Sequence, residues 1–217
     1  MVLLLDAYHL GDPLFLTGLA RDLAARGAGG VLVHGSAERG ERALEALGLV
    51  PEAQDGAWLV HADRERQTVE RAARDLNREL VHEMNEAGVP AVGLLGSDRG
   101  LLRAGAGGLE AGRTAWLETL VGQGVVAVVA SLIDGPDGTA ERPPAAAAAA
   151  LAGALDEPVL LLVRGASPAD EGAPLPAHLL ADPGAAAWLL NAGASVRGLG
   201  RGDLRGAEAA SRPVSAP

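Results

Sequence analysis

Residues 31–40, VLVHGSAERG, have the pattern of an anion-binding turn. Branched apolar residues run into His34 and Gly35, and Ser36 opens a segment with a helical pattern. A turn between a buried strand and a helix N-terminus directs free backbone N–H groups and the positive end of the helix dipole toward a bound anion. The pattern predicts an anion or substrate site at His34, Gly35 and Ser36, with a purely structural turn as the alternative.

A second polar turn, GSDRG at 96–100, follows an apolar segment. Gly96, Ser97 and Asp98 are candidate substrate-binding residues, and Arg99 is a candidate for phosphate binding. The alternatives are that Asp98 caps its own turn and that the Arg99 side chain lies in solvent.

The remaining ionisable residues give weaker signals. Asp6 and His9 could act as a general base near a nucleotide, but a capping aspartate and a surface histidine are favoured. His61 and His82 lack the spacing of four residues at which two histidines on one helix bind zinc, so no metal site is predicted. Asn77 is interpreted as a solvated or packing residue, and Trp58 and Trp116 as parts of a core or a dimer interface.

Composition excludes several classes of function. The formal net charge is −10, which argues against nucleic-acid binding through a basic face. All 18 basic residues are arginine, so no mechanism can use a lysine ammonium group. Without cysteine there is no disulfide or thiolate site. No apolar run approaches the roughly 18–20 residues of a membrane span, and the start MVLLLDAYHLGDP lacks the basic region of a signal peptide. We therefore expect no membrane partner and a cytoplasmic location.

Strands and helices are predicted to alternate along the chain. Expected strands are 2–5, 31–34, 91–95, 125–129 and 158–163, with a short strand or hairpin arm at 57–61 and a loop or hairpin at the glycines of 105–112. Expected helices are 13–26, 36–47, 63–87, 114–122, 144–155 and 183–190.

This alternation predicts the fold class. Continuously apolar strands indicate burial on both faces, so we expect an α/β protein, a three-layer αβα sandwich with a mainly parallel central sheet. Ligands should then lie beyond the carboxyl ends of the strands. Residues 1–205 are predicted to form one domain and 206–217 a frayed tail. The stretch GLGRG at 198–202 resembles a glycine phosphate loop only weakly and is assigned to the tail region.

Four segments resemble one known family in the order in which they occur: VLVHGSAERGERALEALGL, LNRELVHEMNEAGVPAVGLLGSDRGLLRA, VVAVVASLIDGPDG and LLADPGAAAWLL. The family is the amino acid kinases, specifically acetylglutamate kinase and its relative that phosphorylates aminoadipate linked to a carrier protein. The resemblance implies an αβα sandwich, frequently a homodimer, that makes acyl phosphates from ATP and a carboxylate with magnesium.

The catalytic motifs of that family are altered. LLLDAYHLGD stands where the family has Lys-x-Gly-Gly, and the glycine turn is one glycine short. Trp58, Val60 and His61 replace the Arg-x-Thr-Asp that grips the substrate, and Glu141-Arg142-Pro143-Pro144 replaces an Asn-x-Asp motif. Arg197 is the cation nearest the second catalytic lysine and is a further phosphate-binding candidate. The nucleotide-side lobe at the C-terminal end is also shortened.

These changes predict a degenerate kinase, because losing one preorganised donor costs about 10²–10³ in rate. No catalytic residue is assigned. We expect an acetylglutamate kinase-like chain, related to arginine or lysine biosynthesis, that binds a small anionic metabolite or acts as a regulatory subunit, as a homodimer or paired with an active relative. The first alternative is an active kinase of acetylglutamate or carrier-linked aminoadipate, which would need ATP and magnesium; no cofactor is otherwise assigned. The second is a purely structural dimer subunit.

Overall fold

The computed structural model describes residues 1–105, 108–165, 174–200, 203–206 and 210–215. Its centre is an eight-stranded sheet with strand order β12-β14-β13-β11-β1-β2-β8-β5, in which only β13 and β14 pair antiparallel. The strands are β1 (Val2–Leu4), β2 (Gly30–His34), β5 (Ala91–Leu95), β8 (Val126–Ala130), β11 (Val159–Leu162), β12 (Leu175–Pro176), β13 (Val196–Leu199) and β14 (Arg212–Ser215). The predicted α/β class with a mainly parallel sheet is confirmed.

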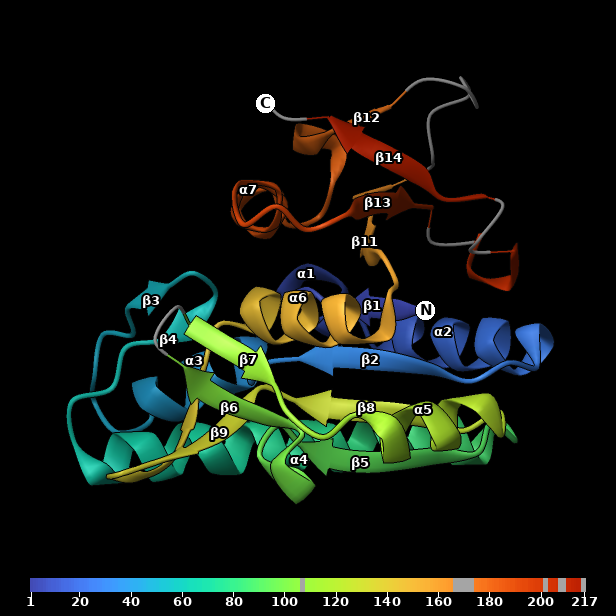
Figure 1. The fold of residues 1–217 in the computed structure, drawn as a ribbon. Coiled ribbons are helices and arrows are strands. Elements are labelled where there is room, and N and C mark those ends of the chain that lie inside the picture. Colours follow the sequence, from blue (N-terminus) through green and yellow to red (C-terminus); the bar gives the residue numbers. More distant parts are fainter. Residues whose placement is uncertain (106–107, 166–173, 201–202, 207–209, 216–217) are drawn as a thin grey trace.

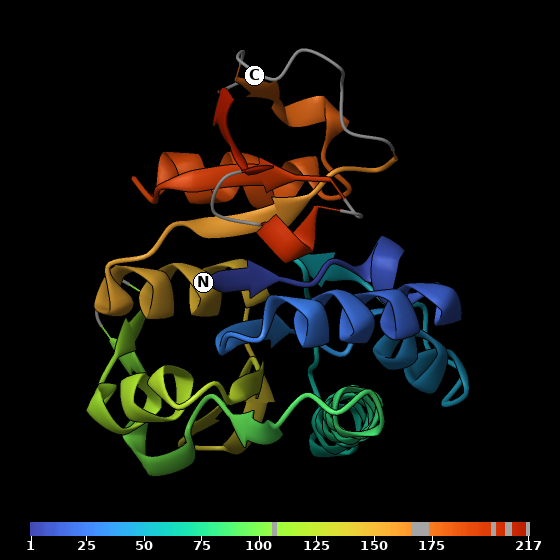
Figure 2. The same ribbon diagram turned by 90° about the vertical axis from the view of Figure 1, so that its right-hand side faces the viewer.

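Helices cover both faces of the sheet, so the molecule has three layers (Figures 1 and 2). One layer packs α5, α6 and α7 on the sheet, and the other packs α2 and α4, with α1 and α3 near the end of β2. The helices are α1 (Ala7–Leu10), α2 (Pro13–Arg26), α3 (Ala37–Glu45), α4 (Asp63–Glu86), α5 (Ala115–Gly122), α6 (Pro144–Leu155) and α7 (Pro183–Asn191).

The central strands are apolar without interruption because both of their faces are covered. Every residue of β1, β2, β8 and β11 is buried, and side chains alternate between the two cores. Strand β5 is only half-buried because it forms one edge of the sheet. The alanine-rich α6 fits close to the sheet because its small side chains allow a short approach between helix and strands.

Helix boundaries follow local capping chemistry. The Asp12 side chain accepts a hydrogen bond from the Leu14 backbone N–H at 2.9 Å, and Pro13 occupies the first helical position of α2. Gly27 ends the helix with a left-handed φ of 64°, which glycine adopts without a steric cost. The predicted span of 13–26 is therefore confirmed, whereas α3 ends two residues before the predicted 47.

Three small hairpins lie outside the central sheet; one follows helix α3, and the other two follow strands of the sheet. They are β3–β4 (Ala53–Gln54 and Ala57–Trp58), β6–β7 (Leu102–Gly105 and Gly108–Ala111) and β9–β10 (Leu132–Gly135 and Gly138–Glu141). Hairpin β6–β7 follows β5, after the 3₁₀ turn η1 (Asp98–Gly100), and β9–β10 follows β8. These hairpins carry Trp58, Arg103 and Glu141, which take part in the sites described below.

Two expectations about exposure and order are corrected. The frayed tail is wrong for Arg212–Ser215, which forms β14 between β12 and β13 because Val214 is buried there opposite Leu175. Short 3₁₀ turns η2 (Ala177–Leu179) and η3 (Leu204–Gly206) also lie in this region. In GLGRG, Gly198 and Leu199 belong to strand β13, whereas 201–202 lie outside the described residues.

His9 is buried rather than on the surface, because its ring packs 4.8 Å from that of Phe15 and bonds to Asp6. The capping role of Asp6 is confirmed, since its carboxylate accepts the His9 backbone N–H at 2.9 Å. Within the described residues, no helix has both the length and the apolar character that crossing a bilayer requires.

Candidate functional site

His34, the last residue of β2, is fully buried and held as a neutral ring. Its Nε2 lies 3.0 Å from the amide nitrogen of Asn77, and its Nδ1 lies 2.8 Å from the carbonyl oxygen of Gly35. Because an amide nitrogen only donates, Nε2 accepts and Nδ1 carries the proton. Burial lowers the pKa of His34 from 6.5 to about 4; the hydrogen bond to Gly35 opposes this shift and the charge of Arg39 adds to it. His34 therefore brings no positive charge to the turn near neutral pH.

Asn77 connects helix α4 to three strands of the sheet. Besides His34, its amide nitrogen donates to the carbonyl oxygens of Val128 at 2.9 Å and Leu94 at 3.4 Å. The side chain is buried, so of the two expected roles the structure supports packing. Asn77 thus fixes the end of β2 against α4.

Replacing Asn77 by Leu should lower the free energy of unfolding by about 2 kcal/mol, because it leaves the buried Nε2 of His34 without a donor. Urea denaturation followed by fluorescence measures this change. His82→Leu, at an exposed position of the same helix, is the matched control and should alter stability by less than about 0.5 kcal/mol. Equal effects of the two substitutions would show that the Asn77 amide does not stabilise the turn.

The backbone after His34 forms an anion-binding concavity. Ser36 has right-handed angles (φ −76°, ψ −17°) and Ala37 has a positive φ of 49°. Successive right- and left-handed residues turn neighbouring N–H groups toward one side, which is the geometry of a backbone nest for anions. The nest is formed by Ser36 and Ala37, within the turn where the sequence predicts an anion site. Substrate binding by His34, Gly35 and Ser36 stays a prediction.

In this structure the nest holds the chain's own carboxylate. The Ser36 backbone N–H donates to Oε1 of Glu141, and the Ser36 hydroxyl lies 3.0 Å from Oε2. A Cβ on residue 35 would lie only 2.6 Å from Oε1 and 2.9 Å from Cγ of Pro144, so the contact requires glycine at that position. Glu141 closes hairpin β9–β10, which brings it to a turn 105 residues away in the sequence.

Burial raises the pKa of Glu141 from 4.5 to about 7. The hydrogen bonds from the Ser36 N–H, the Ser36 hydroxyl and the Trp58 backbone N–H act in the opposite direction, but desolvation is the larger effect. The carboxyl group therefore changes charge near neutral pH while it occupies the nest.

Two cavities beside this turn are acidic. A small cavity of about 80 Å³ between the ends of β1 and β2 and helix α7 is lined by Asp6, Asp55 and Asp182, with no basic side chain among its described lining. A larger one of about 770 Å³ has Asp12, Glu38 and Glu41 on its walls, together with Tyr8 and Trp58. The carboxylates in these two cavities disfavour a second anion there, because like charges at short range repel.

Among the described residues, no group of three or more His, Asp or Glu side chains is arranged to hold a metal ion.

The turn at 96–100 does not line either acidic cavity. Asp98 caps its own turn, since Oδ2 accepts the Leu95 backbone N–H at 2.8 Å. Ser97 donates its backbone N–H to Leu132 O at 3.1 Å, and a Cβ on Gly96 would lie 2.5 Å from Ile133. Gly96, Ser97 and Asp98 are therefore packed against β9 rather than placed beside His34, Gly35 and Ser36.

Arg197 lies within β13 and holds the segment before β14. Its Nε lies 2.7 Å from the Ser211 hydroxyl, and its guanidinium also donates to the Ser211 carbonyl oxygen. This phosphate-binding candidate is therefore engaged in a structural contact.

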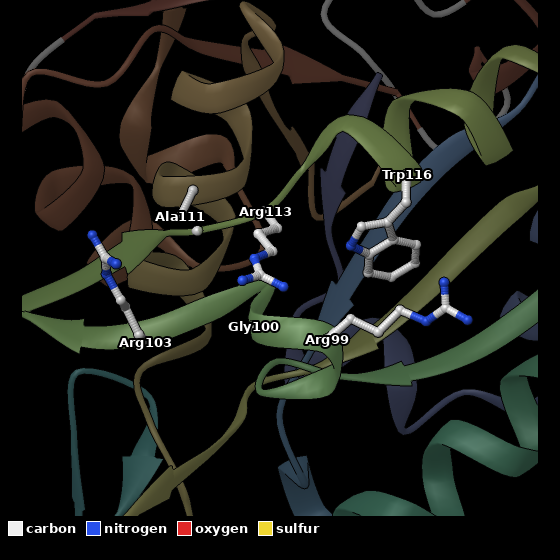
Figure 3. A pocket seen from close by; sticks show the side chains of 7 residues that line it. Arg99, Gly100, Arg103, Ala111, Arg113 and Trp116 are labelled. Carbon is white, nitrogen blue, oxygen red and sulfur yellow. The ribbon is translucent and has the colours of Figure 1, made fainter.

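Arg99, the other candidate, lies in an arginine-lined cavity of about 780 Å³ (Figure 3). The cavity is also lined by Arg103 from β6, Arg113 after β7 and Trp116 from α5. The Arg99 guanidinium lies 5.5 Å from the centre of the Trp116 ring, a cation–π distance. The indole Nε1 of Trp116 is buried and has no hydrogen-bond partner among the described residues, an arrangement that costs about 1–3 kcal/mol.

Comparison with known proteins places this geometry in a family context. No protein-family model matches the chain. The chain is 35% identical over 157 residues to the acetylglutamate kinase of Rubrobacter xylanophilus, covering 67% of this chain and 62% of that protein. It is 32% identical over 166 residues to the acetylglutamate kinase of Roseiflexus sp. (strain RS-1), covering 71% and 64%. The matched region thus spans less than two thirds of these relatives.

Solved structures agree at the level of fold. An N-acetylglutamate synthase from Neisseria gonorrhoeae, complexed with coenzyme A and N-acetyl-glutamate, superposes with a TM-score of 0.67 at 21% identity over 93% of this chain and 54% of that chain. An isopentenyl phosphate kinase superposes with a TM-score of 0.66 at 14% identity over 98% and 97%. The chain resembles the amino acid kinase family in sequence and in fold.

ATP and magnesium are implied for an amino acid kinase, and the residues at this turn do not fit the phosphate groups of a nucleotide. The nest N–H of Ser36 is bound to Glu141, and the described walls of the small cavity beside it carry Asp6, Asp55 and Asp182 without an opposing cation. A triphosphate there would meet carboxylates where an amino acid kinase needs positive charge.

Two features were not identified from the sequence, one at the Ser36 nest and one at the separate arginine-lined cavity. Glu141 was noted only as a departure from a family motif, and its contact with Ser36 depends on tertiary structure. Arg103 and Arg113 lie in a glycine-rich hairpin; the recurrence of arginine at 99, 103 and 113 around one predicted hairpin is the signal that could have found them.

Proposed function

We propose that this chain is an acetylglutamate kinase-like protein that lacks ordinary phosphoryl transfer and works as a metabolite-binding or regulatory subunit in arginine or lysine biosynthesis. The observation that carries the proposal is the Glu141 carboxylate bound in the Ser36 nest. A negative group in that nest competes with a phosphate for the same N–H donors.

Charge supports the same proposal. The chain has no lysine, and two cavities beside the nest have carboxylates as the only charged side chains of their described walls. A third cavity, of about 200 Å³, is lined by Arg39 and Arg42, but these side chains are paired with Glu79 and Glu38. Phosphoryl transfer depends on positioning and on cations that stabilise the charge of the transferred group. A dianionic substrate such as acetylglutamate would also be repelled by Glu41 in the larger cavity, where the neighbouring Glu38 is paired with Arg42.

The direct test is a hydroxamate assay. The purified chain is incubated with magnesium-ATP, acetylglutamate and hydroxylamine, which traps an acyl phosphate as a coloured hydroxamate. We expect no product above that of a mock purification, while the Rubrobacter xylanophilus acetylglutamate kinase gives product under the same conditions. Turnover that grows in proportion to this chain's concentration would overturn the proposal in favour of an active kinase.

The regulatory part is tested by ligand binding and assembly. A ligand that prefers the folded state raises the melting temperature, so thermal shifts with acetylglutamate, arginine and ATP separate a binding protein from a scaffold. We propose a homodimer or a complex with an active relative, and light scattering after size exclusion measures the mass. A monomer that shifts with none of these ligands would contradict the regulatory role.

A further inference from the structure

We propose that the cavity between hairpin β6–β7 and the start of α5 binds a small polyanion through Arg99, Arg113 and the indole N–H of Trp116. The ligand class is a compact molecule with at least two phosphate or carboxylate groups. The inference goes beyond the kinase-like site, because none of these residues lines the cavities beside Ser36. The inference rests on the proposed function in one respect: this cavity would be the place where the anionic metabolite binds.

The charged side chains that line this cavity are all positive, which favours an anion. Three guanidinium groups line one cavity of a chain whose net charge is −10. Arg103 is paired with Glu110, with 3.3 Å between Nη2 and Oε2. Neither Arg113 nor Arg99 has an ion-pair partner among the described residues, and the Arg99 guanidinium makes a cation–π contact with the Trp116 ring. Two guanidinium groups are therefore available to bind phosphate or carboxylate oxygens in bidentate fashion.

Trp116 supplies an independent observation. Its Nε1 is buried and without a partner in the described part of the chain. Figure 3 shows the nitrogen edge of the indole on the side from which Arg113 enters the cavity. Buried donors in native proteins almost always have a partner, so an orphaned N–H on the Arg113 side of this cavity indicates a missing acceptor oxygen.

The backbone that presents Arg99 is also unusual. Arg99 has φ 53° and ψ 20°, a left-handed conformation that is uncommon for a residue with a long side chain. This conformation places its guanidinium over the Trp116 ring. Backbone strain of this kind concentrates at binding sites, where the surrounding structure maintains it.

The cavity has room for such a ligand. Its volume of about 780 Å³ lies within the range of small-molecule sites, and its mouth is formed by exposed arginine side chains. Inorganic tripolyphosphate is a probe that carries several phosphate groups, and citrate is a probe that carries several carboxylate groups. Neither probe needs a nucleotide pocket.

The test is isothermal titration of the whole chain with tripolyphosphate and, separately, with citrate. We expect a Kd below about 1 mM for at least one probe. Arg99→Gln and Arg113→Gln should each weaken binding by about tenfold, since a charge-assisted hydrogen bond is lost in each. Arg71→Gln is the matched control: it makes the same charge change at an exposed position of α4 and should alter Kd by less than about twofold. The stronger probe identifies phosphate or carboxylate as the source.

The NMR signal of the Trp116 indole N–H gives a second readout, which would not change on addition of a probe if Trp116 had only a structural role. In a ¹⁵N–¹H spectrum, Trp116→Phe assigns the Trp116 indole signal, and that signal should shift downfield as the probe is added. Glu110→Gln releases Arg103 and should tighten binding by about twofold.

Two results would overturn the inference. One is the absence of binding by both probes up to about ten times the expected Kd. The other is weakening by Arg71→Gln equal to that by Arg113→Gln, which would show a general effect of charge. The hydroxamate assay is independent of both, so a failure here would leave the proposed function of the Ser36 site standing.

Discussion

Glu141→Gln is expected to raise the free energy of unfolding by about 3 kcal/mol at a pH of about 8 and to change it little at about 4.5. The pKa of Glu141 is raised by burial from 4.5 to about 7, so the folded protein favours the neutral carboxyl group. Below pH 4.5 there is no penalty; as pH rises from 4.5 to about 7 the unfolded chain ionises while the folded carboxyl group stays protonated, so stability falls, and above about 7 the loss is constant. Glutamine keeps an acceptor for the Ser36 N–H without this cost.

His34 has the opposite dependence. Its folded pKa of about 4 lies below the unfolded value of 6.5, so its contribution to stability is present above pH 6.5 and is lost as pH falls through 4. The two effects oppose each other between pH 4.5 and 6.5. In Glu141→Gln only the histidine effect remains, and we expect stability to rise steadily through this window.

Urea denaturation at a series of pH values measures both profiles. Glu52→Gln makes the same charge change at an exposed position and is the control. If the difference between wild type and Glu141→Gln followed the Glu52→Gln curve at every pH, the Glu141 carboxyl group would not be buried in the Ser36 nest. A profile with that difference largest at low pH would reverse the sign argued here.

Much of the fold could be predicted because its signals are local. Asp12-Pro13 and Gly27 define α2 within its own sequence, and continuous apolar runs such as VLVH predict the buried strands. The strand–turn–helix arrangement around His34, Gly35 and Ser36 could also be predicted, since a strand, a glycine and a helix start occur within ten residues. Each of these features is decided by neighbours along the chain.

The parts that could not be predicted depend on distant neighbours. Nothing near Ser36 indicates that Glu141 will bind it, because hairpin β9–β10 must first fold beside β2. The segment around Val214 has no apolar run, and only pairing with β12 and β13 makes it a strand. The burial of His9 could not be predicted either, because its contact with Phe15 forms only when α1 and α2 pack together.

Gly112→Ala is expected to lower the free energy of unfolding by about 3 kcal/mol, at the upper end of the cost of overpacking a well-fitted site. A Cβ at residue 112 would clash with the backbone carbonyl oxygen of Gly100, which accepts the Arg113 N–H at 3.0 Å. A backbone atom cannot move aside as a flexible side chain does, so the strand leading to Arg113 must separate from the turn that carries Arg99.

The same substitution should therefore abolish tripolyphosphate or citrate binding at temperatures where the variant is still folded. Gly122→Ala is the matched control, because no atom lies within 4 Å of a Cβ at that position and alanine favours the helix. Denaturant titration and calorimetry measure the two effects. If Gly112→Ala were as stable as Gly122→Ala, the close packing of β7 on the 96–100 turn would be wrong. If it were unstable yet bound the probe with unchanged Kd, the polyanion site would not depend on the position of Arg113 relative to Arg99.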